Sequence, residues 1–461
     1  MELQENTAQN TLRIAWRQWD RMRVIRANRL RNKDFSFGRQ LNDYSKSQDG
    51  TPMSDYDVMR NNGIEPLTNN LIRQLVKTVL GRYISRRNEL RNASSKSARN
   101  GGGKKYLPDA QKWQEEVRQR NGLDELDVRM LEEFLLSGCA VQRIDFERGS
   151  TDKVVVENVN PAFFFTDMYE DSHTRDCKMV GVLHSMTMAE MMLRFADGDS
   201  RKEKQLLEAY NASTLRERTH NVQMLLADGA RQLDSYFWHA QEGRVRIIEV
   251  WTEQIRKVED EHGWHWQKYW HCRWLSPTAT VISEYDSPYA HGSHPFVMKM
   301  YPLVDGEVHA LVEDVIDQQK FVNRLISTID FSMTMSAKGV LIYPSKSLPE
   351  GYTWDMVKAL WRTPGSIIPY NDKDGGTLPT QISTNATDIG AHELLKVEMD
   401  MFQQVSGVSD ALKGGMNSSG TRGAELYRQQ TENATIALLD IFSTYDSYIT
   451  RRDHKIISLR P

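Results

Sequence analysis

The chain has 461 residues, of which 39% are hydrophobic and 26% are charged, with a formal net charge of −3. No apolar run approaches the ~18 residues of a membrane-spanning helix, and the first ten residues lack the basic-then-apolar order of a signal peptide. We therefore expect a protein that is made and kept in the cytosol. The three scattered cysteines, Cys139, Cys177 and Cys272, argue against a disulfide framework.

Charge is distributed unevenly along the chain. Residues 1–105 contain 21 Lys and Arg against 10 Asp and Glu, whereas the remaining 356 residues contain 38 against 52. A basic first quarter could meet nucleic acid or an acidic partner, although a basic helix is more often a solvated surface.

The first part of the chain is mainly helical in pattern. A helix is predicted at residues 11–31, because Leu12, Ala15, Trp16, Trp19 and Met22 share one face. Further helices are predicted at 68–85 and 108–137. Residues 140–149 and 153–161 have the alternation of a two-stranded hairpin.

The middle of the chain is rich in β-branched and aromatic residues. Residues 244–258 and 264–275 alternate in polarity on either side of a short polar turn, which predicts a strand, turn and strand. Five tryptophans recur there: Trp251, Trp264, Trp266, Trp270 and Trp274. Such aromatics could stack on nucleic-acid bases, but a place in the core or in a subunit interface is the commoner role.

Helices are predicted again at residues 310–337, 391–405 and 422–450, so the fold class is α+β and mainly helical. A glycine- and serine-rich loop separates the last two helices. It resembles a phosphate-binding loop only in the spacing from Gly415 to Gly420, since Thr421 and Arg422 stand where that motif requires Lys and then Ser or Thr. We therefore expect no nucleotide site.

The sequence gives only weak indications of a metal site or a catalytic site. The densest sets are His262, His265, His271 and Cys272, and His173 with Cys177, and neither has the paired ligand spacing of a metal motif. A nuclease would need clustered carboxylates, for which Asp167, Glu170 and Asp171 are the best candidates. No catalytic residue, metal or cofactor is expected.

The order of several segments resembles the portal proteins of tailed double-stranded DNA phages, most closely the podophage-like branch. The matching pieces include PLTNNLIRQLVKTVLGRY, FLLSGCAVQRIDF, YPLVDGEVHALVEDVIDQQKFVNRLIS and VSGVSDALKGGMNSSGTRGAELYRQQ, and together they span most of residues 60–445. Two departures stand out. Ser409 occupies a position where the family commonly has proline, and many members continue past the position of Pro461 into a crown or barrel.

The resemblance implies a ring, usually of twelve subunits, around a channel for DNA. The loop at 408–421 would project into the channel and narrow it. Glycines give such a loop backbone freedom, and small polar side chains bind phosphates weakly, which permits sliding. The implied DNA-facing residues are Lys413, Gly414, Gly415, Met416, Asn417, Ser418 and Arg422.

The resemblance also implies a division of the subunit. Residues 1–200 would form the wing with its basic N-terminal helices, 201–243 a first stem segment, 244–309 a β-rich clip with the five tryptophans at its interface, and 310–337 the second stem helix. Residues 338–390 would return through the wing, 391–450 would form the channel helices, and 451–461 would be the start of a crown or a truncated end.

The implied partners are further copies of the chain, double-stranded DNA bound without sequence preference, the major capsid protein, the terminase and a tail adaptor, with no membrane. The implied location is the capsid vertex of the virion, reached from the host cytoplasm during assembly. Two other classes stay open at this point: a cytoplasmic helical scaffold and a metal-dependent nuclease.

Overall fold

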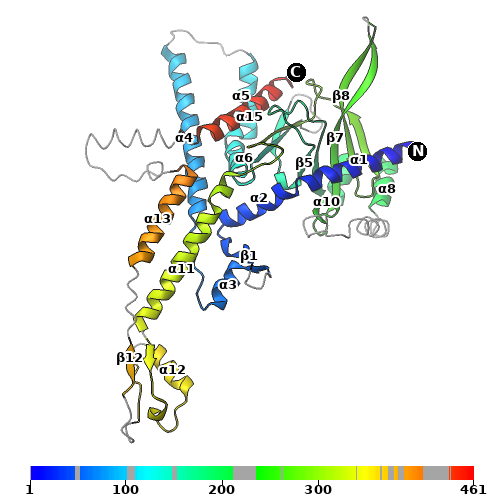
Figure 1. Ribbon diagram of the computed structural model, residues 1–461. Coiled ribbons are helices and arrows are strands. Elements are labelled where there is room, and N and C mark those ends of the chain that lie inside the picture. The colour runs from blue at the N-terminus through cyan, green and yellow to red at the C-terminus, as the bar shows by residue number, and fades with distance from the viewer. Residues whose placement is uncertain are drawn as a thin grey trace. The chain divides into compact units, whose positions relative to one another are not determined.

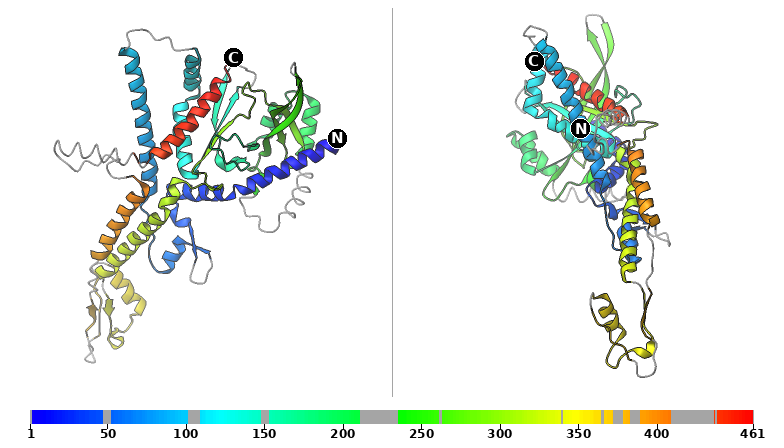
Figure 2. Two further views of the ribbon diagram at one scale, coloured as in Figure 1. Left: turned by 45° about the horizontal axis from the view of Figure 1, so that its top comes forward. Right: turned by 90° about the vertical axis from the view of Figure 1, so that its left-hand side faces the viewer.

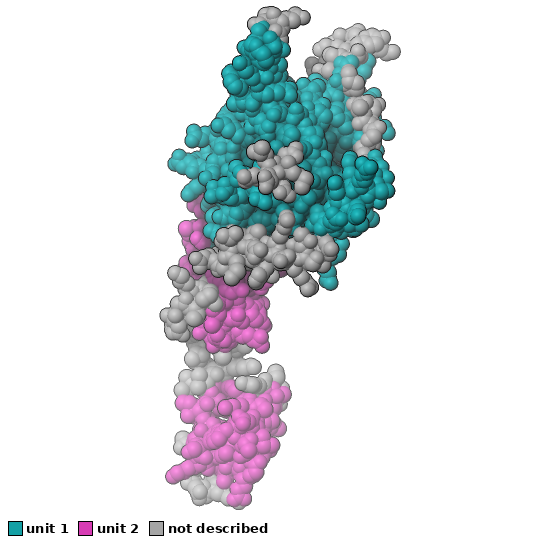
Figure 3. Space-filling model, turned by 90° about the vertical axis from the view of Figure 1, so that its right-hand side faces the viewer, with its two compact units in different colours: residues 1–37, 72–316, 406–461 teal, residues 38–71, 317–405 magenta. Residues whose placement is uncertain are grey.

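The computed structural model describes residues 2–46, 52–100, 109–147, 153–210, 235–260, 263–338, 340–363, 366–371, 378–382, 389–408, 436 and 438–460 (Figure 1). Two compact units are formed. Unit 1 comprises residues 1–37, 72–316 and 406–461, and unit 2 comprises residues 38–71 and 317–405 (Figure 3).

Unit 1 contains most of the helices. They are α1 (Glu2–Arg21), α2 (Arg23–Ser36), α4 (Leu71–Asn100), α5 (Asp109–Asn121), α6 (Leu123–Ser137), α7 (Met188–Phe195), α8 (Ser200–Ala209), α10 (Ser235–Trp238) and α15 (Leu439–Ile457). The helix predicted at 11–31 is confirmed as parts of α1 and α2, which meet at Met22. Its predicted inner face is buried except for Trp16, which is half-buried.

Two antiparallel sheets complete unit 1. The first has three strands in the order β10 (Phe296–Met300), β3 (Cys139–Phe146) and β4 (Val154–Asn158). The second has five strands in the order β5 (Phe164–Thr166), β6 (Met179–Met186), β7 (Val245–Asp260), β8 (Gly263–Leu275) and β9 (Val281–Asp286). The predicted hairpins β3–β4 and β7–β8 are both confirmed.

The segment 244–309 was expected to be a separate β module, and the structure corrects this. Strand β7 pairs along eight residues with β6, and β10 pairs along five residues with β3. Backbone hydrogen bonds therefore join this segment to strands that precede residue 187. Gly181 in β6 allows the ring of Phe165 in β5 to pack directly against the backbone of β6, because a Cβ atom at Gly181 would lie 2.3 Å from Cζ of Phe165.

The C-terminal helix extends further toward the C-terminus than predicted. Residues 451–461 were expected to start a crown or to be a truncated end, yet α15 runs to Ile457 without a break. Arg452, Ile456 and Leu459 are buried within unit 1. This segment therefore belongs to the core of unit 1.

Unit 2 contains β1 (Tyr44–Lys46), β2 (Pro52–Ser54), α3 (Asp55–Asn61), α11 (Ile316–Lys338), β11 (Val340–Ile342), α12 (Trp354–Arg362), β12 (Thr380–Ile382) and α13 (Ile389–Ser406). The helix predicted at 310–337 is α11, preceded by a 3-10 turn at Leu311–Val315. Helices α11 and α13 lie side by side (Figures 1 and 2), and β11 pairs with β12 antiparallel.

A row of polar side chains on α11 binds the extended segment before α4. Gln319, Asn323 and Ser327 are spaced four residues apart and so share one face of the helix. They accept hydrogen bonds from the backbone N–H groups of Leu71, Asn69 and Leu67 at 2.9, 3.0 and 2.8 Å. These side chains therefore provide hydrogen-bond acceptors for backbone N–H groups that are not paired within a strand or helix.

Candidate functional site

The loop implied to line the channel falls largely outside the described residues. Lys413, Gly414, Gly415, Met416, Asn417, Ser418 and Arg422 all lie in the segment 409–435, of which nothing is described. The helix before the loop ends at Ser406, and Gly407 follows it with a φ of +67°. A glycine in this left-handed conformation is a common helix stop, because it carries no Cβ. The predicted end of the helix before the loop is therefore confirmed.

The five tryptophans lie on one face of the β7–β8 ribbon but differ in burial. Trp251 and Trp274 are fully buried, Trp270 is half-buried, and Trp264 and Trp266 are 61% and 71% exposed. Trp264 and Trp266 lie toward the turn, where the ribbon extends past the rest of the sheet (Figure 1). The set therefore divides into core residues and a projecting aromatic surface.

Unit 2 exposes a stripe of apolar residues that sequence reasoning missed. Leu394, Val397, Met401 and Val405 on α13 are each more than 40% exposed. Their spacing of three, four and four residues places them along one face, as in a helix that packs against another helix. This spacing was readable in the sequence, but the pattern alone does not say whether the covering partner is inside or outside the subunit.

The short segment between α11 and α13 also exposes large apolar side chains. They are Ile342, Trp354, Met356, Ile367, Tyr370 and Leu378. An isolated exposed apolar residue is ordinary, but a set concentrated in one small segment is typical of a protein contact. We name the α13 residues the α13 stripe and these six residues the tip surface.

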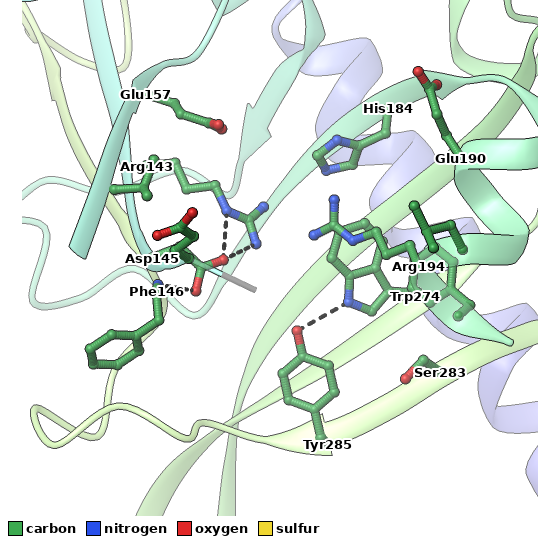
Figure 4. A pocket seen from close by; sticks show the side chains of 14 residues that line it. Arg143, Asp145, Phe146, Glu157, His184, Glu190, Arg194, Trp274, Ser283 and Tyr285 are labelled. Carbon is green, nitrogen blue, oxygen red and sulfur yellow. Dashed lines mark hydrogen bonds and ion pairs between the residues drawn. The ribbon is translucent and has the colours of Figure 1, made fainter. Parts of the chain in front are cut away.

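A cavity of about 680 Å³ opens in unit 1 beside the two sheets (Figure 4). Arg194 of α7 lies over the indole of Trp274, 4.5 Å from the ring centroid, and Glu157 and Glu190 stand on other walls. Its lining contains no Ser, Cys or Lys in hydrogen-bond contact with a histidine. The described lining therefore offers no activated nucleophile.

A buried carboxylate binds two residues of this cavity's lining, Arg143 and His184, and joins the two sheets. Glu249 of β7 accepts hydrogen bonds from Arg143 of β3, from His184 Nε2 at 2.7 Å and from Trp251 Nε1 at 2.8 Å. Burial acts to raise the pKa of Glu249, but Arg143 and His184 outweigh it and lower that pKa to about 2. Burial lowers the pKa of His184, although its hydrogen bond to Glu249 acts in the opposite direction. The network is structural.

The candidate nuclease carboxylates do not converge. Asp167 accepts a hydrogen bond from the N–H of Lys178 at 2.9 Å, Asp171 binds His173 and Arg175, and the Glu170 N–H donates to Asp176. His271 pairs with Glu284 and Asp286, Cys272 is buried, and His262 lies outside the described residues. Within the described ranges no three His, Cys, Asp or Glu side chains are placed to hold a metal ion.

In the described part of the chain, no helix combines the length and apolarity that crossing a bilayer requires. The chain was also compared with known proteins. No curated protein matches it. The family model described as "Phage P22-like portal protein" matches residues 12–459, nearly the whole chain. The chain therefore belongs to the P22-like phage portal protein family and functions as a portal, the head-to-tail connector through which double-stranded DNA is packaged and ejected.

Proposed function

We propose that this chain is the subunit of a twelve-membered portal ring, and that the α13 stripe on unit 2 holds neighbouring subunits together. Portals are structural rather than enzymatic, and the family implies an oligomeric ring with capsid and terminase partners. The observation that supports the proposal most directly is the α13 stripe, because a solvated row of four large apolar residues is costly to leave uncovered.

We further propose a revised division of the subunit. A stem needs two long helices, and residues 201–243 supply only α8 and the four-residue α10 among their described part. Helices α11 and α13 are 23 and 18 residues long and lie side by side, so they are the better pair for the stem. The segment 340–382 between them, with the tip surface, would then be the clip that meets the terminase and the tail adaptor.

The α13 stripe can be tested with one added charge. Val397→Glu is expected to shift the purified protein from rings to monomers, because a carboxylate cannot be buried against an apolar neighbour without a partner. His392→Glu, on the opposite and exposed face of α13, is the matched control and is expected to assemble normally. Light scattering and negative-stain microscopy give the mass and shape. Rings of normal size and yield from Val397→Glu would show that the α13 stripe is not part of the subunit interface.

We also propose that Trp264 and Trp266 contact the neighbouring subunit. The contacts that close a ring join different surfaces of adjacent subunits, so a projecting aromatic pair on one subunit can meet the next. The same assay applies: Trp264→Ser with Trp266→Ser is expected to weaken assembly, whereas His265→Ser with Gln267→Ser on the other face of β8 is not. Equal assembly of the two double variants would contradict this contact.

Finally, we propose that the loop at 408–421 narrows the channel around DNA, with Lys413, Gly414, Gly415, Met416, Asn417, Ser418 and Arg422 facing the duplex. The support is compositional: Lys413 and Arg422 are the only charged residues between Asp410 and Glu425, and Asn417, Ser418 and Ser419 are small and polar. Deleting residues 414–418 is expected to leave rings intact but to yield heads with less DNA, measured as packaged genome per particle. Normally filled heads would show that the loop is only a connector.

A further inference from the structure

A second cavity, of about 480 Å³, lies in unit 1 beside the last helix. Helix α15 contributes Arg451, His454 and Lys455 to its lining. The strand β8 contributes Trp270, and the segment around β10 contributes His294 and other residues. The cavity thus combines cations from the C-terminal helix with an aromatic wall.

Both cations of α15 that line the cavity are held only by neutral groups. Arg451 donates to the carbonyl oxygens of Ser172, Met298 and His173 at 3.3, 3.3 and 2.9 Å, and to Oγ1 of Thr174 at 2.8 Å. Lys455 donates through Nζ to the carbonyl oxygens of His294 and, at 3.0 Å, of Phe296. An ammonium has three N–H donors, so one donor of Lys455 is left for a further acceptor.

Arg452, which follows Arg451 on the same helix, does have counter-charges. Arg452 forms ion pairs with Asp127 and Asp453, as a buried arginine normally does. Among the described residues, no carboxylate lies within 4.0 Å of the charged nitrogens of Arg451 or Lys455. The two cations that α15 contributes to the cavity are therefore the ones without a counter-charge.

A third cation adds to the local positive charge. Nζ of Lys299 donates at 3.3 Å to the Ser172 carbonyl oxygen that Arg451 also contacts. Burial lowers the pKa of Lys455 to about 7 and also lowers the pKa of Lys299, and in both cases repulsion from Arg451 adds to the effect.

The nearby carboxylates are already engaged with other groups. Asp171 binds His173 and Arg175, and Glu253, which itself lines the cavity, binds Lys268 at 3.1 Å. A partly buried cluster of like charges is unfavourable unless an anion joins it.

We infer that this cavity binds a phosphate-class oxyanion, held by Lys455 and Arg451 of α15. A phosphate monoester carries a charge of about −1.5 to −2 at neutral pH, which suits the two cations that α15 contributes to the cavity, with Lys299 nearby, better than a single carboxylate does. The remaining donor of Lys455 and the exposed side chain of His454 are available to its oxygens. The cavity is larger than a bare anion needs, so a free phosphate and a phosphate at the end of a DNA strand share the required chemistry.

The test uses the intact chain and inorganic phosphate at constant ionic strength. Phosphate is expected to bind saturably by titration calorimetry and to raise the unfolding temperature, whereas equal concentrations of chloride do neither. Lys455→Gln keeps a donor for the two carbonyl oxygens and removes the charge, and it is expected to weaken phosphate binding at least tenfold. Lys358→Met, an exposed lysine on α12, is the control and is expected to bind as the unaltered protein does.

A second arm separates the two sources of phosphate. An oligonucleotide with a 5′-phosphate is expected to compete with inorganic phosphate if the cavity accepts a strand end, and the same oligonucleotide without it is not. Competition by neither oligonucleotide assigns the cavity to a small phosphate. Absence of saturable phosphate binding, or binding by Lys455→Gln equal to that of the unaltered protein, would overturn the proposal.

Discussion

Arg452→Met is expected to lower the free energy of unfolding by about 3–5 kcal/mol, because it leaves a carboxylate buried without its counter-charge. Arg452 and Asp127 each have side chains no more than 2% exposed, and they form an ion pair between α15 and α6. Without the guanidinium, Asp127 keeps Nε2 of Gln142 at 3.4 Å and an ion-pair contact with Arg87 at 4.0 Å. Neither contact replaces a direct ion pair.

Denaturant unfolding at fixed protein concentration measures this effect. Arg460→Met is the matched control, because Arg460 is exposed just after the end of α15, and its change is expected to be below about 0.5 kcal/mol. Combining Arg452→Met with Asp127→Leu is expected to recover much of the lost stability, since an apolar pair can replace a buried ion pair. A loss below about 1 kcal/mol for Arg452→Met alone would contradict this account of how α15 is held.

Glu249→Ala is expected to cost about 3–5 kcal/mol as well, because it removes the shared acceptor of three buried donors. Arg143 would keep only its ion pair with Asp145, at 2.8 Å, and His184 and Trp251 would lose their hydrogen-bond partner. The three-stranded and five-stranded sheets would also lose the hydrogen bond that joins β3 to β7. Glu157→Ala, at an exposed position on β4, is the control and is expected to change stability little.

The pH dependence of unfolding gives a separate test of the same network. The pKa of Glu249 is lowered from its ordinary value of 4.5 to about 2 in the folded protein, so the unfolded chain takes up the proton first as the pH falls. The stabilisation is therefore fully present above pH 4.5 and is lost as the pH falls toward 2, by about 3 kcal/mol in all. Glu249→Gln is expected to flatten this part of the stability curve. A variant with the same slope between pH 5 and pH 3 as the unaltered protein would show that Glu249 does not contribute to it.

Local patterns predicted the elements that depend on near neighbours. The inner face of the first helix and the hairpins β3–β4 and β7–β8 follow from side-chain periodicity, which each segment carries in itself. The order of segments likewise identified the family, and the family model covers residues 12–459. The end of the helix before Gly407 could be predicted for the same reason, because a helix end depends on a few adjacent residues.

Long-range strand pairing could not be predicted from the sequence, and it changed the interpretation of the middle of the chain. Strand β7 pairs with β6, and β10 pairs with β3, across long stretches of sequence. The hydrogen bonds of these pairings join backbone groups that nearly every residue carries. The sequence of a strand therefore does not identify the strand with which it pairs. For this reason the segment 244–309 was predicted as a separate clip, although its strands belong to the sheets of unit 1.

The tryptophans show what the sequence by itself determined and what only the tertiary structure decided. Alternation correctly predicted the two-stranded ribbon that carries all five. The register of β7 and β8 then places them on one face, because directly opposed residues of paired strands point to the same side. Burial depends instead on what lies against that face. The neighbours β6 and β9 pair with the ribbon only as far as Thr252 and His271, so Trp251 and Trp274 are covered while Trp264 and Trp266 extend beyond the sheet into solvent. The same reason applies to Arg451 and Lys455, because whether a charge has a partner depends on segments that meet only in the folded chain.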